Sequence, residues 1–168
     1  PVPCRIKNEN VKGELILNSS SLRGKRFFLL DMDGTIYLGD RLFDGTVDFL
    51  NYVRASGGKY LFLTNNSSRS VEAYIERMAR FGIRTQKDDF LTSVDALCVY
   101  LEKHGCRSKR LYALGTASFR RQLSDAGFSV TDRLEDKIDA LVCGFDTELT
   151  YRKLDNACRL IRNGALYL

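Results

Sequence analysis

The stretch Arg26-Phe27-Phe28-Leu29-Leu30-Asp31-Met32-Asp33-Gly34-Thr35 carries the strongest structural signal in this chain. Its apolar part, Phe27 to Leu30, is short and uninterrupted, which predicts a strand buried on both faces of a parallel sheet. Binding sites of open α/β sheets lie just beyond the carboxyl ends of such strands. The sequence therefore predicts that the two carboxylates after the strand lie at a site.

Asp31 and Asp33 are spaced so that both side chains can address one ligand, because residues i and i+2 of an extended segment share a face. Gly34 then permits a sharp turn that brings backbone amides toward the same place. A calcium loop is excluded, since counting from Asp31 that pattern has Asp at positions 1, 3 and 5, Gly at 6 and Glu at 12. The chain has Thr, Ile and Leu at positions 5, 6 and 12.

The chemistry that remains is a carboxylate that attacks phosphorus and forms an aspartyl-phosphate. This reaction needs a magnesium ion to neutralise phosphate oxygens and a second acid to protonate the leaving group. The pattern Asp-x-Asp-Gly-Thr at a strand end supplies these parts within residues 31–35. The competing interpretation is an acidic turn without any chemical role.

Length and composition indicate an ordinary soluble domain: the chain has 168 residues, of which 44% are hydrophobic and 28% charged. No apolar run approaches the roughly 20 residues that cross a bilayer, and the first residues lack the apolar segment of a secretory signal. We therefore expect a cytoplasmic protein without a membrane partner.

The net charge of +5 does not indicate a nucleic-acid partner, because basic residues alternate with acidic ones instead of forming a stripe. The five cysteines and the single histidine, His104, lack the spacing of a zinc site. We expect free thiols in a reducing compartment.

Strand and helix patterns alternate along the chain after residues 1–23, which we interpret as an N-terminal extension. Glycine stops and apolar periodicity predict helices and strands in turn. Helices are expected at 45–55, 70–81, 94–104, 117–126 and 150–162, and further strands at 60–63, 110–114, 138–143 and, buried, from 164 onward. This order predicts an α/β fold with a Rossmann-like, doubly wound parallel sheet in a three-layer α/β/α arrangement.

Two segments resemble motifs of the haloacid-dehalogenase-like (HAD) phosphatases. Residues 31–39, Asp-Met-Asp-Gly-Thr-Ile-Tyr-Leu-Gly, are similar to the first motif of the NagD-like branch, which includes nitrophenyl-phosphate and sugar-phosphate phosphatases. Residues 61–70, Leu-Phe-Leu-Thr-Asn-Asn-Ser-Ser-Arg-Ser, resemble the second motif. The similarity continues through residues 111–116 and 143–146.

The resemblance implies a role for each carboxylate. Asp31 would be the nucleophile, and Asp33 would be the general acid and base. Both would also hold Mg²⁺, Asp31 through its carboxylate and Asp33 through its backbone carbonyl.

The resemblance also implies four contacts to the phosphate group. Met32 and Gly34 would offer backbone amides, Thr64 its hydroxyl and Asn65 its amide. The expected substrate is a small phosphorylated metabolite such as a sugar phosphate, a nucleotide or nitrophenyl phosphate.

The domain organisation follows from the same resemblance. Residues 24–92 would form the N-terminal part of the HAD-like core, and residues 93–168 an inserted α/β cap domain that is incomplete at its C-terminus. Caps of this kind close over the active site and govern substrate choice. Since related caps often mediate dimers, a homodimer is a further expectation.

Neither the lysine of the family's third motif nor the acidic metal ligand of its fourth is found at the family's place. We therefore expect a truncated chain that is a poor phosphatase alone, because the phosphoryl charge and the metal each lack a partner. One alternative is a capless HAD protein that uses Lys137 and Asp146 for these roles. Another is a noncatalytic HAD-fold fragment.

Overall fold

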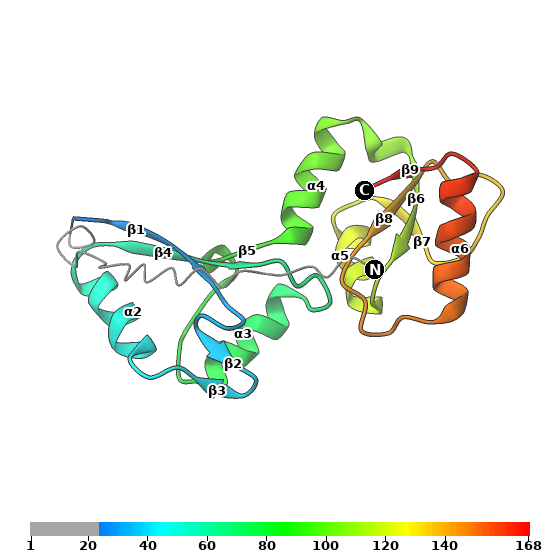
Figure 1. Cartoon of the computed structure of the whole chain (residues 1–168). Coiled ribbons are helices and arrows are strands. Elements are labelled where there is room, and N and C mark those ends of the chain that lie inside the picture. The colour runs from blue at the N-terminus through cyan, green and yellow to red at the C-terminus, as the bar shows by residue number, and fades with distance from the viewer. Residues whose placement is uncertain (1–23) are drawn as a thin grey trace, which may run out of the picture.

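Two parallel sheets organise residues 24–168, which are the residues that the computed structural model describes (Figure 1). The first sheet has the order β1-β4-β5 and the second the order β7-β6-β8-β9. Their strands are β1 (Phe27–Asp31), β4 (Lys59–Thr64), β5 (Phe90–Thr92), β6 (Arg110–Leu114), β7 (Ser129–Thr131), β8 (Ala140–Cys143) and β9 (Leu166–Tyr167). Every pairing within these sheets is parallel, which confirms the predicted α/β class.

Five helices and a small hairpin complete the described part of the chain. The helices are α2 (Thr46–Ala55), α3 (Val71–Arg80), α4 (Ser93–Lys103), α5 (Ala117–Asp125) and α6 (Tyr151–Arg162). The hairpin pairs β2 (Tyr37–Leu38) with β3 (Arg41–Leu42), and short 3₁₀ turns occupy Lys87–Asp89 and Cys106–Ser108. The predicted extension, residues 1–23, lies outside the described residues. No helix within residues 24–168 combines the length and apolar character needed to cross a membrane.

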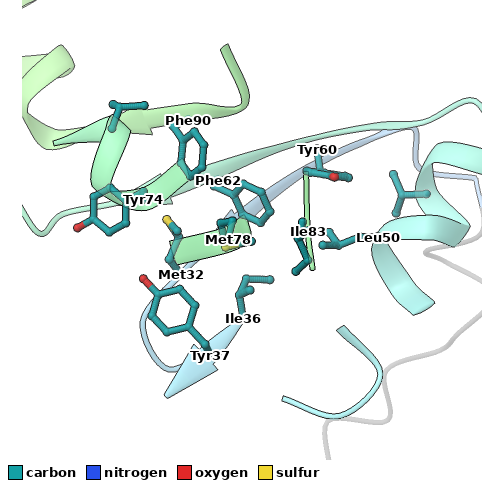
Figure 2. Packing of buried hydrophobic residues seen from close by; sticks show 12 residues of the cluster. Met32, Ile36, Tyr37, Leu50, Tyr60, Phe62, Tyr74, Met78, Ile83 and Phe90 are labelled. Atoms are coloured by element: carbon teal, nitrogen blue, oxygen red, sulfur yellow. The ribbon is translucent and has the colours of Figure 1, made fainter. Parts of the chain in front are cut away.

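The first sheet packs its helices on one face. The connections β1-α2-β4 and β4-α3-β5 run in the same direction along the sheet, and right-handed crossovers then place both helices on the same side. Figure 2 shows the resulting core, in which Tyr60 and Phe62 of β4 pack with Leu50 of α2 and with Tyr74 and Met78 of α3.

The opposite face of β1 is exposed, so the prediction of a strand buried on both faces is wrong. Phe27 and Leu29 are each 58% exposed, whereas Phe28 and Leu30 pack against the core. An uninterrupted apolar run looks the same in sequence whether one face or both are covered, and no helix within residues 24–168 covers this face.

The second sheet is doubly wound, an arrangement that the sequence predicted for the core sheet. The connection β6-α5-β7 runs in one direction and β8-α6-β9 in the other, so α5 and α6 lie on opposite faces. Two separate clusters reflect this: Leu111 and Val142 pack with α4 and α5, and Tyr112 and Leu141 pack with α6. The last strand, β9, is an exposed edge strand and not the buried strand that we expected.

Hydroxyl side chains fix where several helices begin. Ser70, Thr92, Thr116 and Thr150 are the N-caps of α3, α4, α5 and α6, and each accepts a hydrogen bond from the backbone N–H three residues later. Thr92 is also the last residue of β5, so the chain passes directly from the first sheet into α4, the helix that leads to the second sheet (Figure 1).

Burial predicts which face of the first sheet carries stability. Phe62 is fully buried, so Phe62→Ala is expected to lower the free energy of unfolding by about 3–5 kcal/mol. Leu29→Ala, on the exposed face of β1, is expected to cost less than about 1 kcal/mol. Urea unfolding followed by circular dichroism measures both; equal losses would contradict the one-sided packing.

Candidate active site

The carboxyl ends of the three strands of the first sheet lie along one edge. In the parallel ladders Asp31 is paired with Leu63, and Thr64 is paired with Thr92. Asp31 therefore lies beside the residue that precedes Thr64, on the neighbouring strand. The two predicted motifs, far apart in the sequence, thus end at the same edge of the sheet, where α/β folds place their sites.

A tight turn after β1 presents the two carboxylates to solvent. The Met32 side chain is fully buried, and its carbonyl accepts the N–H groups of Thr35, Ile36 and Tyr37 at 3.3, 3.0 and 3.3 Å. Asp31 and Asp33, on either side of this anchor, are exposed. The alternation predicted from the sequence is present: the middle residue points into the core while its neighbours do not.

Gly34 adopts a backbone conformation that L-residues rarely take, with φ of 86°. Its N–H donates to the carbonyl of Tyr37 at 2.8 Å, which closes the turn. The amide that we expected to face a phosphate group is thus engaged within the loop, and that contact stays a prediction that requires the bond to be shared or released.

Thr64 is buried, and its hydroxyl belongs to a small network at the end of β4. The Tyr74 hydroxyl donates to the carbonyl of Asn66 at 3.0 Å and lies 3.4 Å from the Thr64 hydroxyl, so Thr64 is the donor in that pair. The Thr64 hydroxyl also accepts the Asn66 N–H at 3.2 Å. Asn65 is exposed, and its carbonyl accepts from the Ser93 hydroxyl at 3.2 Å.

The charge of Asp33 affects two buried phenols, those of Tyr37 and Tyr74. Burial, followed by the negative charge of Asp33, raises the pKa of Tyr37 to about 12, although the positive charge of Arg77 acts in the opposite direction. Burial also raises the pKa of Tyr74; the hydrogen bond with Thr64 offsets part of this effect, and Asp33 adds to it. The charge of Asp33 thus acts on both phenols, and the Tyr74 hydroxyl contacts the Thr64 hydroxyl.

Tyr74 was not among the site residues that the sequence predicted. The side chain is in the core, yet its hydroxyl makes the two contacts described above. The signal available in the sequence was a tyrosine, in place of phenylalanine, at a core-facing position of α3. Buried tyrosine hydroxyls usually find a partner, so this choice hints at a polar neighbour.

The oxygens of Asp31 and Asp33 suit a magnesium ion. Mg²⁺ prefers oxygen ligands and is usually bound by one or two carboxylates, with waters and substrate oxygens completing its octahedron. An exposed carboxylate on Asp31 and the backbone carbonyl of Asp33 fit that requirement. Within residues 24–168 no group of three or more His, Cys, Asp or Glu side chains is arranged to hold a metal.

Asp146 does not join this site, so the capless alternative is wrong. It follows β8 of the second sheet, and β8 pairs with β6 and β9, not with β1. Its carboxylate is buried and forms an ion pair with Lys153 at 2.9 Å. The carboxylate is therefore engaged within the second sheet's own loops.

Comparison with known proteins identifies the class. The family model of haloacid dehalogenase-like hydrolases matches residues 28–129, more than half of the 168 residues. The chain belongs to this family.

Individual relatives are phosphatases. An acid sugar phosphatase of Staphylococcus aureus is 30% identical over 141 residues, which cover 84% of this chain and 53% of the relative. The crystal structure of a 4-nitrophenylphosphatase from Thermotoga maritima superposes with a TM-score of 0.78 at 33% identity, covering 85% of this chain and 53% of that one. A glycerol phosphate phosphatase from Mycobacterium tuberculosis in complex with magnesium gives 0.77 at 29% identity, covering 85% and 43%. The chain thus spans about half the length of the curated relatives it matches.

The raised pKa of Tyr37 predicts a loss of stability in alkali. Its ordinary value is 10.0, so between about pH 10 and 12 the unfolded chain releases this proton while the folded protein retains it. The stabilisation is complete below the unfolded pKa and is lost as the pH rises toward 12. Urea unfolding at several pH values should show this decline, and Tyr37→Phe should make it shallower.

A carboxamide variant tests whether Asp33 faces this phenol. Because the charge of Asp33 contributes to the shift, Asp33→Asn should lower the pKa of Tyr37, as followed by NMR of the ring carbon that carries the hydroxyl. An unchanged Tyr37 titration in Asp33→Asn would contradict the placement of Asp33.

Proposed function

We propose that the protein is a magnesium-dependent phosphomonoester hydrolase that acts on a small phosphorylated metabolite, such as a sugar phosphate, a nucleotide or nitrophenyl phosphate. The observation that carries the proposal is the exposed Asp31 carboxylate at the end of β1, in parallel register with the end of β4. Membership of the haloacid dehalogenase-like hydrolases and the similarity to sugar-phosphate and nitrophenyl-phosphate phosphatases support it.

The two carboxylates divide the chemistry. A carboxylate oxygen of Asp31 attacks phosphorus, the bond from phosphorus to the ester oxygen breaks, and Asp33 gives its proton to the departing alcohol. The product is an aspartyl-phosphate on residue 31. Asp33, now ionised, takes a proton from water, whose oxygen attacks phosphorus and returns Asp31 as a free carboxylate with release of phosphate.

Asp33 is suited to both halves of this cycle. It is exposed, so alcohol and water can reach its carboxyl group, and its backbone is fixed by the turn around Met32. Its position two residues after the nucleophile keeps the two groups on one side of the chain.

The phosphate group would be held by the ends of two strands. The amides of Met32 and Gly34 come from the turn after β1, and the Thr64 hydroxyl and the Asn65 amide from the end of β4. The Gly34 amide can take part only by sharing its bond to Tyr37, so we expect its conformational role to be the larger one. The Thr64 hydroxyl can donate to phosphate only by turning its proton away from the Tyr74 hydroxyl. Such preorganised donors stabilise charge that develops on phosphate oxygens.

Asp31 and Asp33 would also hold Mg²⁺, through the carboxylate and the backbone carbonyl respectively. When bound, the ion neutralises negative charge on the phosphate oxygens. The magnesium complex of the glycerol phosphate phosphatase, whose fold superposes on this chain, supports this part of the proposal.

The two sheets would have different roles, one in catalysis and the other in substrate choice. We propose that residues 24–92 form the catalytic core and residues 93–168 a cap that covers the site and governs substrate choice. The passage from β5 into α4 at Thr92 supports this division, since it is where the chain leaves the first sheet.

Replacing the nucleophile tests the proposal. In the whole natural protein, Asp31→Asn is expected to reduce Mg²⁺-dependent hydrolysis of nitrophenyl phosphate to background, because the amide cannot form the acyl-phosphate. Asp33→Asn is expected to lower kcat by about 10²–10⁴-fold.

Asp48→Asn is the matched control, since Asp48 is an exposed carboxylate on α2 and is expected to leave activity unchanged. Retained activity in Asp31→Asn would refute the nucleophile assignment. Absence of any Mg²⁺-dependent hydrolysis in the unaltered protein would favour a noncatalytic role.

A further inference from the structure

The second sheet has its own crevice of the kind that binds ligands. Because the connections from β6 and β8 run in opposite directions, the gap between these strands at their carboxyl ends is a topological switch point. Open α/β sheets bind their ligands at such points. Here the crevice is bordered by Gly115 and Thr116 after β6 and by Gly144 and Phe145 after β8.

This crevice is filled by a loop of the first sheet. The loop is residues 65–70, which connect β4 to α3 and which we call the β4–α3 loop. The Phe145 N–H donates to the Ser67 hydroxyl oxygen at 2.7 Å, and the Thr116 hydroxyl donates to the carbonyl of Ser68 at 3.0 Å. Gln122 of α5 adds a bond from its side-chain amide to the carbonyl of Arg69 at 3.2 Å.

The fit around Ser67 is close. The Ser67 side chain is buried, and a Cβ added to Gly144 would lie 2.7 Å from its hydroxyl oxygen and 3.2 Å from the ring of Phe119. Gly144 has no positive φ, so glycine is required here for space and not for backbone conformation. The absence of a side chain at Gly144, after β8, therefore leaves the space that the Ser67 side chain occupies.

Two more carbonyls of the loop accept hydrogen bonds from side chains outside it. That of Asn65 accepts from Ser93 at the start of α4, and that of Asn66 accepts from the Tyr74 hydroxyl. Side chains of four different positions thus bond to the carbonyls of residues 65, 66, 68 and 69. These bonds hold the loop together with internal bonds from the Ser68 N–H and hydroxyl to Asn66 Oδ1 at 3.0 and 2.6 Å. Three of the four bonds to its carbonyls come from residues 93–168, through Ser93, Thr116 and Gln122.

The same loop begins directly after Thr64 and includes Asn65, the two residues that would bind phosphate from β4. We propose that Ser67 is a positioning residue. Its contact with the second sheet holds the β4–α3 loop in the crevice between β6 and β8. The second sheet thereby determines where the phosphate donors Thr64 and Asn65 lie. The docking of the loop on the second sheet follows from the geometry alone. Its effect on phosphate binding rests on the proposed function. A buried hydroxyl that loses its hydrogen-bond partner costs free energy. We therefore expect the loop to keep this shape only while Ser67 stays bonded to the Phe145 N–H.

Hydrogen exchange tests the docking without requiring turnover. In Ser67→Ala the Phe145 N–H loses its acceptor, so exchange in residues 143–146 and in the β4–α3 loop should rise by about tenfold or more. Gly144→Ala approaches the contact from the opposite side and should have a similar effect. Combining the two should be less than additive, since Ser67→Ala removes the oxygen that the methyl group of Gly144→Ala would meet.

The matched control is Ser108→Ala, an exposed serine in the 3₁₀ turn after α4, which should leave exchange at both places unchanged. Circular dichroism checks that each variant is folded, and Gly144→Ala replaces Ser67→Ala as the test if the latter unfolds. Unaltered exchange of residues 143–146 in the folded variant would overturn the docking.

Inorganic phosphate in the presence of Mg²⁺ tests the coupling to the site. Its dissociation constant, measured by calorimetry on the whole natural protein, should rise about five- to tenfold in Ser67→Ala, the range that the loss of one hydrogen bond produces. The KM for nitrophenyl phosphate should rise with it, while kcat should change less. Increased exchange with unchanged phosphate affinity would overturn the positioning role, whereas absence of hydrolysis in the unaltered protein would refute only the proposed function.

Discussion

The parallel, in-register pairing of β1 with β4, continued by β5, is the constraint on which the rest of this structure depends. It aligns Asp31 with Leu63 and Thr64 with Thr92, so that two polar segments more than thirty residues apart end at one edge. A register shift of one residue would turn every side chain of a strand to the opposite face. The core prevents this, because Phe28, Leu30, Tyr60 and Phe62 must all face α2 and α3.

The same packing shapes the chemistry of the site. Met32 is buried between two exposed aspartates, so its packing in the hydrophobic core turns the proposed nucleophile and the proposed acid toward solvent. Tyr37 and Tyr74 extend the core up to Asp33 and Thr64, and their pKa values rise because they are desolvated there. Apolar burial and polar placement are therefore properties of the same few residues.

Local pattern was enough for part of this picture. Periodicity and glycine stops located the helices and the longer strands, β6 at the bounds expected, and the Asp-x-Asp-Gly-Thr spacing located the carboxylates. The short strands β5 and β7 were missed, since three residues carry no periodicity, and the exposed face of β1 was misjudged.

The contact between Ser67 and Phe145 joins positions that are 78 residues apart. The residue pattern of neither segment predicts it. Such contacts are set by how the sheets meet, which is a tertiary property.

The central claim is that a covalent bond to phosphorus forms on residue 31, at the tip of the first strand. Borohydride reduces an acyl-phosphate to the alcohol, so protein quenched during turnover of nitrophenyl phosphate and then reduced should contain homoserine in place of aspartate. Peptide mass spectrometry locates that change. We expect homoserine at residue 31 in protein that is turning over. Homoserine at another carboxylate, or none during active hydrolysis, would refute a phosphorylated Asp31.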